Sequence, residues 1–452
     1  MVIVFALLAL LVLGILVAAN WYLWRRLFRD TTRGPGRARR AGAVLIAGGW
    51  VLAVGALVTE RAGAPFWLQR VLAWPGFLWL ALSIYLLLAV LAGEAVRPLL
   101  RRFLERRTPA AVAIPQRETV PAVAHRDDPR PPEPQSQKSS ESAQSPESAQ
   151  SPESLESARS PESSGFMEAP ESPQLLAAPS RRLFVSRVVA GTAAAAAVGT
   201  VGYGTYGVLR GPRVKRVTVP LAKLPRAAHG YRIAVVSDIH LGPILGRGFA
   251  QKVVDTINAT QPDLIAVVGD LVDGSVKDLG PAAAPLAQLT ARHGAYFVTG
   301  NHEYFSGAEQ WVEEVRRLGL HPLENARTEL PHFDLAGVND IRGESEGQGP
   351  DFTKALGDRD TARACVLLAH QPVQIHEAVE HAVDLQLSGH THGGQLWPGN
   401  FVAAAANPTV AGLERYGDTQ LYVSRGAGAW GPPTRVGAPS DITVIELASA
   451  QA

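Results

Sequence analysis

Five short segments in the second half of the chain combine carboxylate, imidazole and amide side chains, each directly after an apolar run. The segments are Asp238-Ile239-His240, Gly269-Asp270-Leu271-Val272-Asp273, Gly300-Asn301-His302-Glu303, His370 and Gly389-His390-Thr391-His392. They offer only hard or borderline metal ligands. A carboxylate such as Asp270 can bridge two divalent ions and offset their mutual repulsion. Together the segments predict a two-metal hydrolase site.

The apolar runs before these segments predict buried strands in a mixed α/β sandwich. They cover residues 233–236, 264–268, 296–298, 366–369 and 385–387. Rigid strands followed by loops can hold several ligands within the tolerance that a metal site needs. Residues 249–259 and 308–318 carry apolar side chains at helical spacing and predict covering helices. Three later runs have no long helices between them and predict a second sheet: residues 335–338, 421–423 and 442–447.

Three long apolar stretches near the start predict a membrane region. They cover residues 2–19, 41–58 and 71–96, each near the length that spans a bilayer. A signal peptide for the first stretch and buried core helices for the others are the alternatives. The first stretch has no basic residue ahead of it and no evident cleavage site. We therefore predict three transmembrane helices within an all-α region at residues 1–107.

The arginines predict the orientation of these helices. Seven arginines lie within residues 25–40 and five within residues 97–107, whereas residues 60–70 are nearly balanced in charge. Connections on the cytoplasmic side carry an excess of Lys and Arg. We therefore expect a multi-pass protein of the inner membrane whose first connection, and whose chain after residue 107, lie in the cytoplasm.

Residues 108–180 predict a disordered linker rich in Ser, Pro, Glu and Gln. A near-exact repeat of Glu-Ser-Ala-Gln-Ser-Pro occupies residues 141–154. Such a segment cannot bury enough apolar surface to offset its chain entropy.

Residues 181–212 predict either a twin-arginine export signal or a fourth transmembrane helix. Arg181 and Arg182 precede an Ala/Gly-rich stretch at residues 188–209. A true signal would make the twin-arginine export machinery a partner. Both alternatives place the next domain, residues 213–452, outside the cytoplasm. Four basic residues then lie on the wrong side for a simple charge rule and could rest on anionic lipid head groups: Arg210, Arg213, Lys215 and Arg216.

The overall charge and the cysteine content exclude other classes of protein. A net charge of +2 argues against a dedicated nucleic-acid binder. The single cysteine, Cys365, excludes an intramolecular disulfide and a thiolate cluster, and its apolar surroundings in the sequence predict a core position.

The ordered set of five segments resembles the calcineurin-like metallophosphoesterase superfamily over about residues 230–450. The resemblance implies a four-layer αββα sandwich and a binuclear, metal-dependent phosphoesterase, with a phosphodiesterase expected. Longer strings resemble the bacterial membrane-associated branch called YkuE-like or YaeI-like, at residues 237–242, 269–274, 370–372, 388–396, 424–426 and 430–433.

The resemblance also implies roles for nine residues. It places Asp238, His240 and His392 on one ion, Asn301, His370 and His390 on the other, and Asp270 between them. A hydroxide held between the ions would attack phosphorus. His302 would donate a proton to the leaving oxygen or stabilise it, oriented by Asp273. Mn, Fe and Zn all tolerate this ligand set.

Two other functions stay open, as does the role of Glu303. A lipid pyrophosphohydrolase of the UDP-diacylglucosamine type is suggested by the membrane region and by Trp397, Phe401 and Trp430. A noncatalytic membrane sensor is the third alternative. The expected substrate is a small or lipid-linked phosphoester. Glu303 either orients a neighbouring backbone or a ligand, or is a surface or loop carboxylate.

Overall fold

A computed structural model describes residues 2–106 and 181–450 of the chain. The predicted linker at residues 108–180 lies outside the described residues. Four of the described helices are long and apolar enough to cross a membrane. They are α1 (Val2–Trp24), α2 (Arg37–Arg61), α3 (Phe66–Arg106) and α4 (Arg181–Leu209).

The long helices pack on one another through a shared apolar cluster. Leu23 of α1, Ile46 of α2, Ala81 of α3 and Ala197 of α4 are all buried in it. A short π-helix, Arg25–Arg29, follows α1 directly. Each of the three predicted spans lies within one helix, and the α4 helix is continuous to Leu209. The prediction of transmembrane helices is supported, while the twin-arginine signal stays a prediction.

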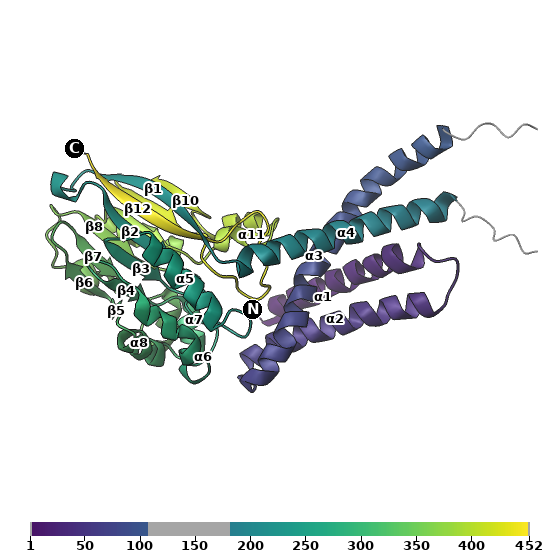
Figure 1. Ribbon diagram of the computed structural model, residues 1–452, viewed down its shortest axis with the longest axis horizontal. Helices are drawn as coiled ribbons and strands as arrows, with labels where there is room; N and C mark the ends of the chain where they lie inside the picture. Colours follow the sequence, from purple (N-terminus) through teal and green to yellow (C-terminus); the bar gives the residue numbers. More distant parts are fainter. Residues whose placement is uncertain (1, 107–180, 451–452) are drawn as a thin grey trace, which may run out of the picture. The chain divides into compact units, whose positions relative to one another are not determined.

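The rest of the described chain forms two six-stranded sheets (Figure 1). The first has the order β1 (Arg213–Leu221), β12 (Asp441–Ser449), β2 (Tyr231–Val236), β3 (Leu264–Val268), β4 (Ala295–Val298) and β5 (His321–Pro322). The second has the order β10 (Gly412–Tyr416), β11 (Thr419–Val423), β9 (Leu385–Ser388), β8 (Cys365–Leu368), β7 (Asp334–Gly337) and β6 (Ala326–Glu329).

Three buried clusters hold the layers together. Ile233 and Val268 of the first sheet meet Leu335 and Leu387 of the second in the central cluster. A further cluster joins the first sheet to covering helices, and another joins the second sheet to its own. The helices are α5 (Arg247–Ala259), α6 (Val276–Ala283) and α8 (Ala308–Arg317) on the first sheet, and α9 (Phe352–Leu356) and α10 (Ile375–Glu380) on the second. The predicted four-layer αββα sandwich is confirmed.

One strand lies in a different sheet from the predicted one. Residues 442–447 were expected in the second sheet, but β12 lies in the first, parallel to β1 and antiparallel to β2. All but two of its nine residues are buried. A strand that is buried on both faces carries the same apolar pattern in either sheet, so the sequence could not reveal its neighbours.

Candidate metal centre

The candidate residues lie where strands of the two sheets end. Strands β2, β3 and β4 run parallel in the first sheet, and β8 and β9 run parallel in the second. Parallel strands direct their carboxyl ends to one edge of a sheet, where loops can form a site. The residues follow in this order: Asp238 and His240 after β2, Asp270 and Asp273 after β3, Asn301 and His302 after β4, His370 after β8, and His390 and His392 after β9.

The backbone at these positions is unusual. Nine non-glycine residues of the described chain have a positive φ angle. Five of the nine are predicted ligands: Asp238, His240, Asp270, His390 and His392. A left-handed conformation costs a non-glycine residue on the order of 1 kcal/mol or more, and such residues cluster at functional sites. Local strain is therefore concentrated at the predicted ligands.

Glycine is required beside one of these strained positions. Gly269 precedes Asp270 and has a φ of +72°. A Cβ atom there would lie 2.6 Å from the Nδ1 atom of His370 and 2.7 Å from the backbone of Gly300. The absence of a side chain at Gly269 lets three ligand-bearing loops approach one another closely.

The first group of candidate ligands joins Asp238, His240 and His392. Their ligand atoms all lie within 4.8 Å of one another, and all three residues are buried. The Nε2 atoms of His240 and His392 are 3.0 Å apart, and Nε2 of His392 lies 3.3 Å from Oδ1 of Asp238. The structure thus brings together the three residues that the resemblance places on one ion.

The second group joins Asp270, His370 and His390, with Asn301 beside them. Oδ2 of Asp270 lies 3.1 Å from Nε2 of His370, and Oδ1 of Asn301 lies 3.0 Å from Nδ1 of His390. The same Oδ2 atom is 3.8 Å from Nε2 of His240, which belongs to the first group. Asp270 therefore stands between the two groups, where a bridging ligand is expected.

The electrostatic environment keeps two of the histidines neutral. Burial and the charge of His370 lower the pKa of His390 to about 4. Burial, His240 and Arg435 hold the pKa of His392 well below its usual range. Neutral imidazole is the form that binds a metal ion.

His370 shows that the site suits a cation. Burial alone would lower its pKa, but the carboxylates of Asp270, Asp238 and Asp340 raise it well above the usual value. Its buried Nε2 atom faces Oδ2 of Asp270 at 3.1 Å but makes no hydrogen bond of regular geometry with the described residues. Buried carboxylates gathered around this imidazole nitrogen fit a positive ion.

His302 and Asp273 form a pair at the side of the site. Nδ1 of His302 lies 2.7 Å from Oδ1 of Asp273. Burial would lower the pKa of His302, but Asp273 raises it to about 9. Burial would raise the pKa of Asp273, but His240 and His302 lower it to about 2. The pair is thus an imidazolium and a carboxylate near neutral pH.

Asp273 has a second contact that the sequence did not predict. Its Oδ1 atom also lies 2.8 Å from Nδ1 of His240, a predicted ligand. A carboxylate on the far nitrogen of a ligating histidine fixes the ring and raises its basicity. One carboxylate therefore orients both a predicted ligand and the predicted proton donor.

Glu303 is fully buried, and its carboxylate organises the backbone of two ligand loops. It accepts hydrogen bonds from the backbone N–H groups of Asp270 at 3.0 Å, Leu271 at 2.8 Å and Gly300 at 2.6 Å. The interpretation that Glu303 orients a neighbouring backbone is confirmed, and a surface position is excluded. Burial, followed by the charge of Asp270, raises its pKa to about 7.

Arg435 is a site residue that the sequence did not reveal. Its Nη1 atom donates to the carbonyl oxygen of His392 at 3.0 Å, and its Nη2 atom lies 3.0 Å from Nδ1 of the same histidine. Its Nε atom donates to the carbonyl oxygen of Gly428 at 2.7 Å. Arg435 lies 43 residues after His392 in a Gly/Pro-rich segment, just beyond the string at residues 430–433 and outside every predicted motif.

Comparison with known proteins gives matches to the same part of the chain. Residues 231–394 match the model of the calcineurin-like phosphoesterase family. The Danio rerio protein called transmembrane protein with metallophosphoesterase domain is 38% identical over 262 residues, which cover 55% of this chain and 60% of that protein. This chain thus spans about three fifths of that relative's length.

Two bacterial relatives are matched over most of their own length. An uncharacterized metallophosphoesterase of Aquifex aeolicus is 34% identical over 240 residues, covering 52% of this chain and 91% of that protein. The uncharacterized metallophosphoesterase YkuE of Bacillus subtilis is 29% identical over 284 residues, covering 60% of this chain and 98% of that protein.

Proposed function

The chain belongs to the calcineurin-like metallophosphoesterase family, and from this premise we propose that it is a membrane-anchored phosphodiesterase with two divalent metal ions. The observation that carries the proposal is the position of Asp270 between two groups of buried ligands. Asp238, His240 and His392 would hold one ion, and Asn301, His370 and His390 the other, with Asp270 shared.

Metal binding and proton donation would be carried out by different residues of the chain. When bound, the ions would supply positive charge for the phosphoryl oxygens and an activated water molecule. His302 holds a proton because its pKa is raised to about 9, and it lies beside the ligand groups. It would donate this proton to the leaving oxygen, while Asp273 fixes the orientation of its ring.

The proposed activity is tested by an ester panel on the full chain, purified in detergent, with Mn, Fe or Zn added singly. We expect hydrolysis of bis(p-nitrophenyl) phosphate and about tenfold slower hydrolysis of p-nitrophenyl phosphate, a difference of about 1.4 kcal/mol in barrier. Metal binding without hydrolysis of any ester would favour the noncatalytic sensor instead.

Exposed apolar side chains around the site favour a lipid-linked substrate as a second candidate. The rings of Phe305 and Trp430 lie 5.6 and 5.7 Å from the ring of His302, and both side chains are exposed. Helix α11 (Gly399–Ala406) has no buried residue, and its Phe401 side chain is 65% exposed. Faster turnover of a membrane-bound pyrophosphate ester than of its soluble analogue would support this candidate.

We also propose that the catalytic domain faces away from the cytoplasm. The predicted outer connection between α2 and α3 lies beside the site, because the guanidinium of Arg61 is 5.7 Å from the ring of Phe305. The end of α4 at Leu209, which is predicted to lie on the outer side, leads directly into β1 of the catalytic domain. We expect a reporter fused after Ala452 to be active only outside the cytoplasm; activity restricted to the cytoplasm would contradict the orientation.

A further inference from the structure

A cavity between α4 and the loop before β12 is lined by basic side chains, and the proposed reaction does not use this cavity. Its volume is about 670 Å³, which is within the range of small-molecule sites. Thirteen described residues line it, three of them arginines and none acidic. The lining includes Tyr203 and Tyr206 of α4.

Close packing of α4 on the loop forms this cavity. Thr205 and Thr434 share a hydrogen bond of 2.7 Å between their hydroxyl oxygens. A Cβ atom on Gly204 would lie only 2.7 Å from the carbonyl oxygen of Arg435, so a glycine is needed at this contact. The helix and the loop are therefore packed on each other where they meet, while most of the residues that line the cavity are exposed.

The polar end of the cavity has positive charges without partners. No ion pair or side-chain hydrogen bond joins Arg210 or Arg213 to another described residue. Arg435 differs, because its guanidinium is already bound to the carbonyl oxygens of Gly428 and His392. Asp441, the next acidic residue along the chain, is not in the lining and pairs with Arg425 at 3.9 Å.

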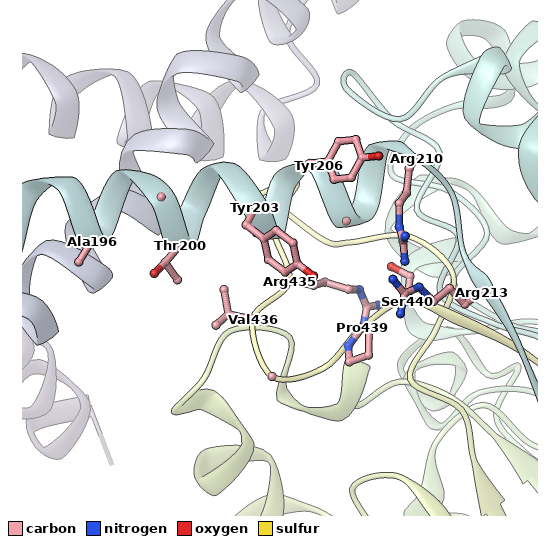
Figure 2. A pocket seen from close by; sticks show the side chains of 13 residues that line it. Ala196, Thr200, Tyr203, Tyr206, Arg210, Arg213, Arg435, Val436, Pro439 and Ser440 are labelled. Carbon is pink, nitrogen blue, oxygen red and sulfur yellow. The ribbon is translucent and has the colours of Figure 1, made fainter.

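A buried hydroxyl group supplies an independent sign of a ligand. Ser440 is only 5% exposed, and its Oγ atom has no hydrogen-bond partner among the described residues. Figure 2 shows Ser440 in the same end of the cavity as Arg210, Arg213 and Arg435. A buried polar group normally has a partner, and an oxygen-rich anion would provide one for the hydroxyl and for both free guanidinium groups.

The opposite end of the cavity is apolar and lies along a predicted membrane span. It is lined by Ala196, Gly199 and Thr200 of α4. Figure 2 places Ala196 and Thr200 away from the arginines. Tyr203 lies between the two ends, as aromatic residues do at a membrane interface. The cavity thus runs from the middle of a candidate membrane span to the arginines at its end, along one helix.

We propose that this cavity binds an anionic phospholipid. Its phosphate would contact Arg210, Arg213 and the hydroxyl of Ser440, and an acyl chain would lie along Ala196 and Gly199. The site also explains why Arg210 and Arg213 lie on the predicted outer side, where the charge rule does not expect basic residues. Lipid binding at this site does not depend on the proposed catalysis.

The test measures phospholipid retained by the full chain in a nonionic detergent, using native mass spectrometry. Phosphatidylglycerol should be retained and phosphatidylcholine should not. The double substitution Arg210→Gln and Arg213→Gln should weaken retention about 30-fold, because each basic residue near an anionic membrane surface contributes about 1 kcal/mol to binding. Arg216→Gln is the matched control, because Arg216 is exposed on the same strand but does not line the cavity.

A second variant addresses the apolar end without changing any charge. A Cβ atom on Gly199 would have no atom within 4 Å, and leucine favours a helix, so Gly199→Leu is expected to extend into the cavity while α4 keeps its conformation. It should also lower phosphatidylglycerol retention, and it carries the test if the double variant does not fold. Unchanged retention in either folded variant, or an equal loss in Arg216→Gln, would overturn the proposal. Displacement by equimolar glycerol phosphate would overturn a lipid ligand in favour of a soluble phosphate.

Discussion

Asp270→Asn is expected to lower kcat for bis(p-nitrophenyl) phosphate by about a thousandfold or more, because two ions would lose their shared carboxylate and with it several kcal/mol of transition-state stabilisation. The Oδ2 atom of Asp270 faces His370 at 3.1 Å and His240 at 3.8 Å, one residue from each ligand group. Asparagine keeps the shape of the side chain but removes the negative charge that would hold the two cations together.

Metal content should fall together with activity. We expect elemental analysis to give two ions per chain for the unchanged protein and one or fewer for Asp270→Asn. Asp418→Asn is a suitable control, because Asp418 is exposed in a turn between β10 and β11, away from the candidate ligands. A folded Asp270→Asn protein with full activity and two ions would contradict both the bridging role and the two-metal mechanism.

The candidate ligands could be identified from the sequence, because each follows a buried strand in a short, recognisable segment. Five motifs after five apolar runs are sufficient to place Asp238, Asp270 and His390 after strands, which the structure shows as β2, β3 and β9. The same runs predict a mixed α/β sandwich, and the resemblance implies its four layers. These features could be predicted because the information is local: each motif is complete within a few residues.

Contacts between distant segments are harder to predict. Arg435 reaches His392 across 43 residues and lies just outside the string at residues 430–433, so the motifs do not include it. The role of Glu303 depends on three backbone N–H groups, from the loops after β3 and β4, that converge on its carboxylate. The sequence alone does not show this convergence. The sheet that contains β12 depends on pairing with β1, more than 200 residues earlier. Such features arise from tertiary packing and have no periodic signal.

If His302 donates the proton, the loss of kcat in His302→Ala should depend on the leaving group of the ester. His302→Ala should lower kcat about a hundredfold to ten-thousandfold for a diester with an alkyl leaving group, which needs a proton on departure. The loss should be much smaller for bis(p-nitrophenyl) phosphate, because nitrophenolate leaves readily without a proton. Metal content should not change, since His302 is not among the predicted ligands.

His229→Ala provides the matched control, because His229 is exposed and belongs to no ligand group. An equal loss for both leaving groups would exclude proton donation and assign His302 to binding or structure.

The pH dependence gives a second measure of the same role. Asp273 raises the pKa of His302 to about 9, so the protonated form persists through neutral pH and is lost as the pH rises through that value. Asp273→Asn removes the raising charge, and the alkaline limb of kcat for the alkyl ester should therefore move to lower pH. Because Asp273 also contacts His240, metal content must be measured in the same samples. A limb that stays in place at full metal content would show that another group carries the proton.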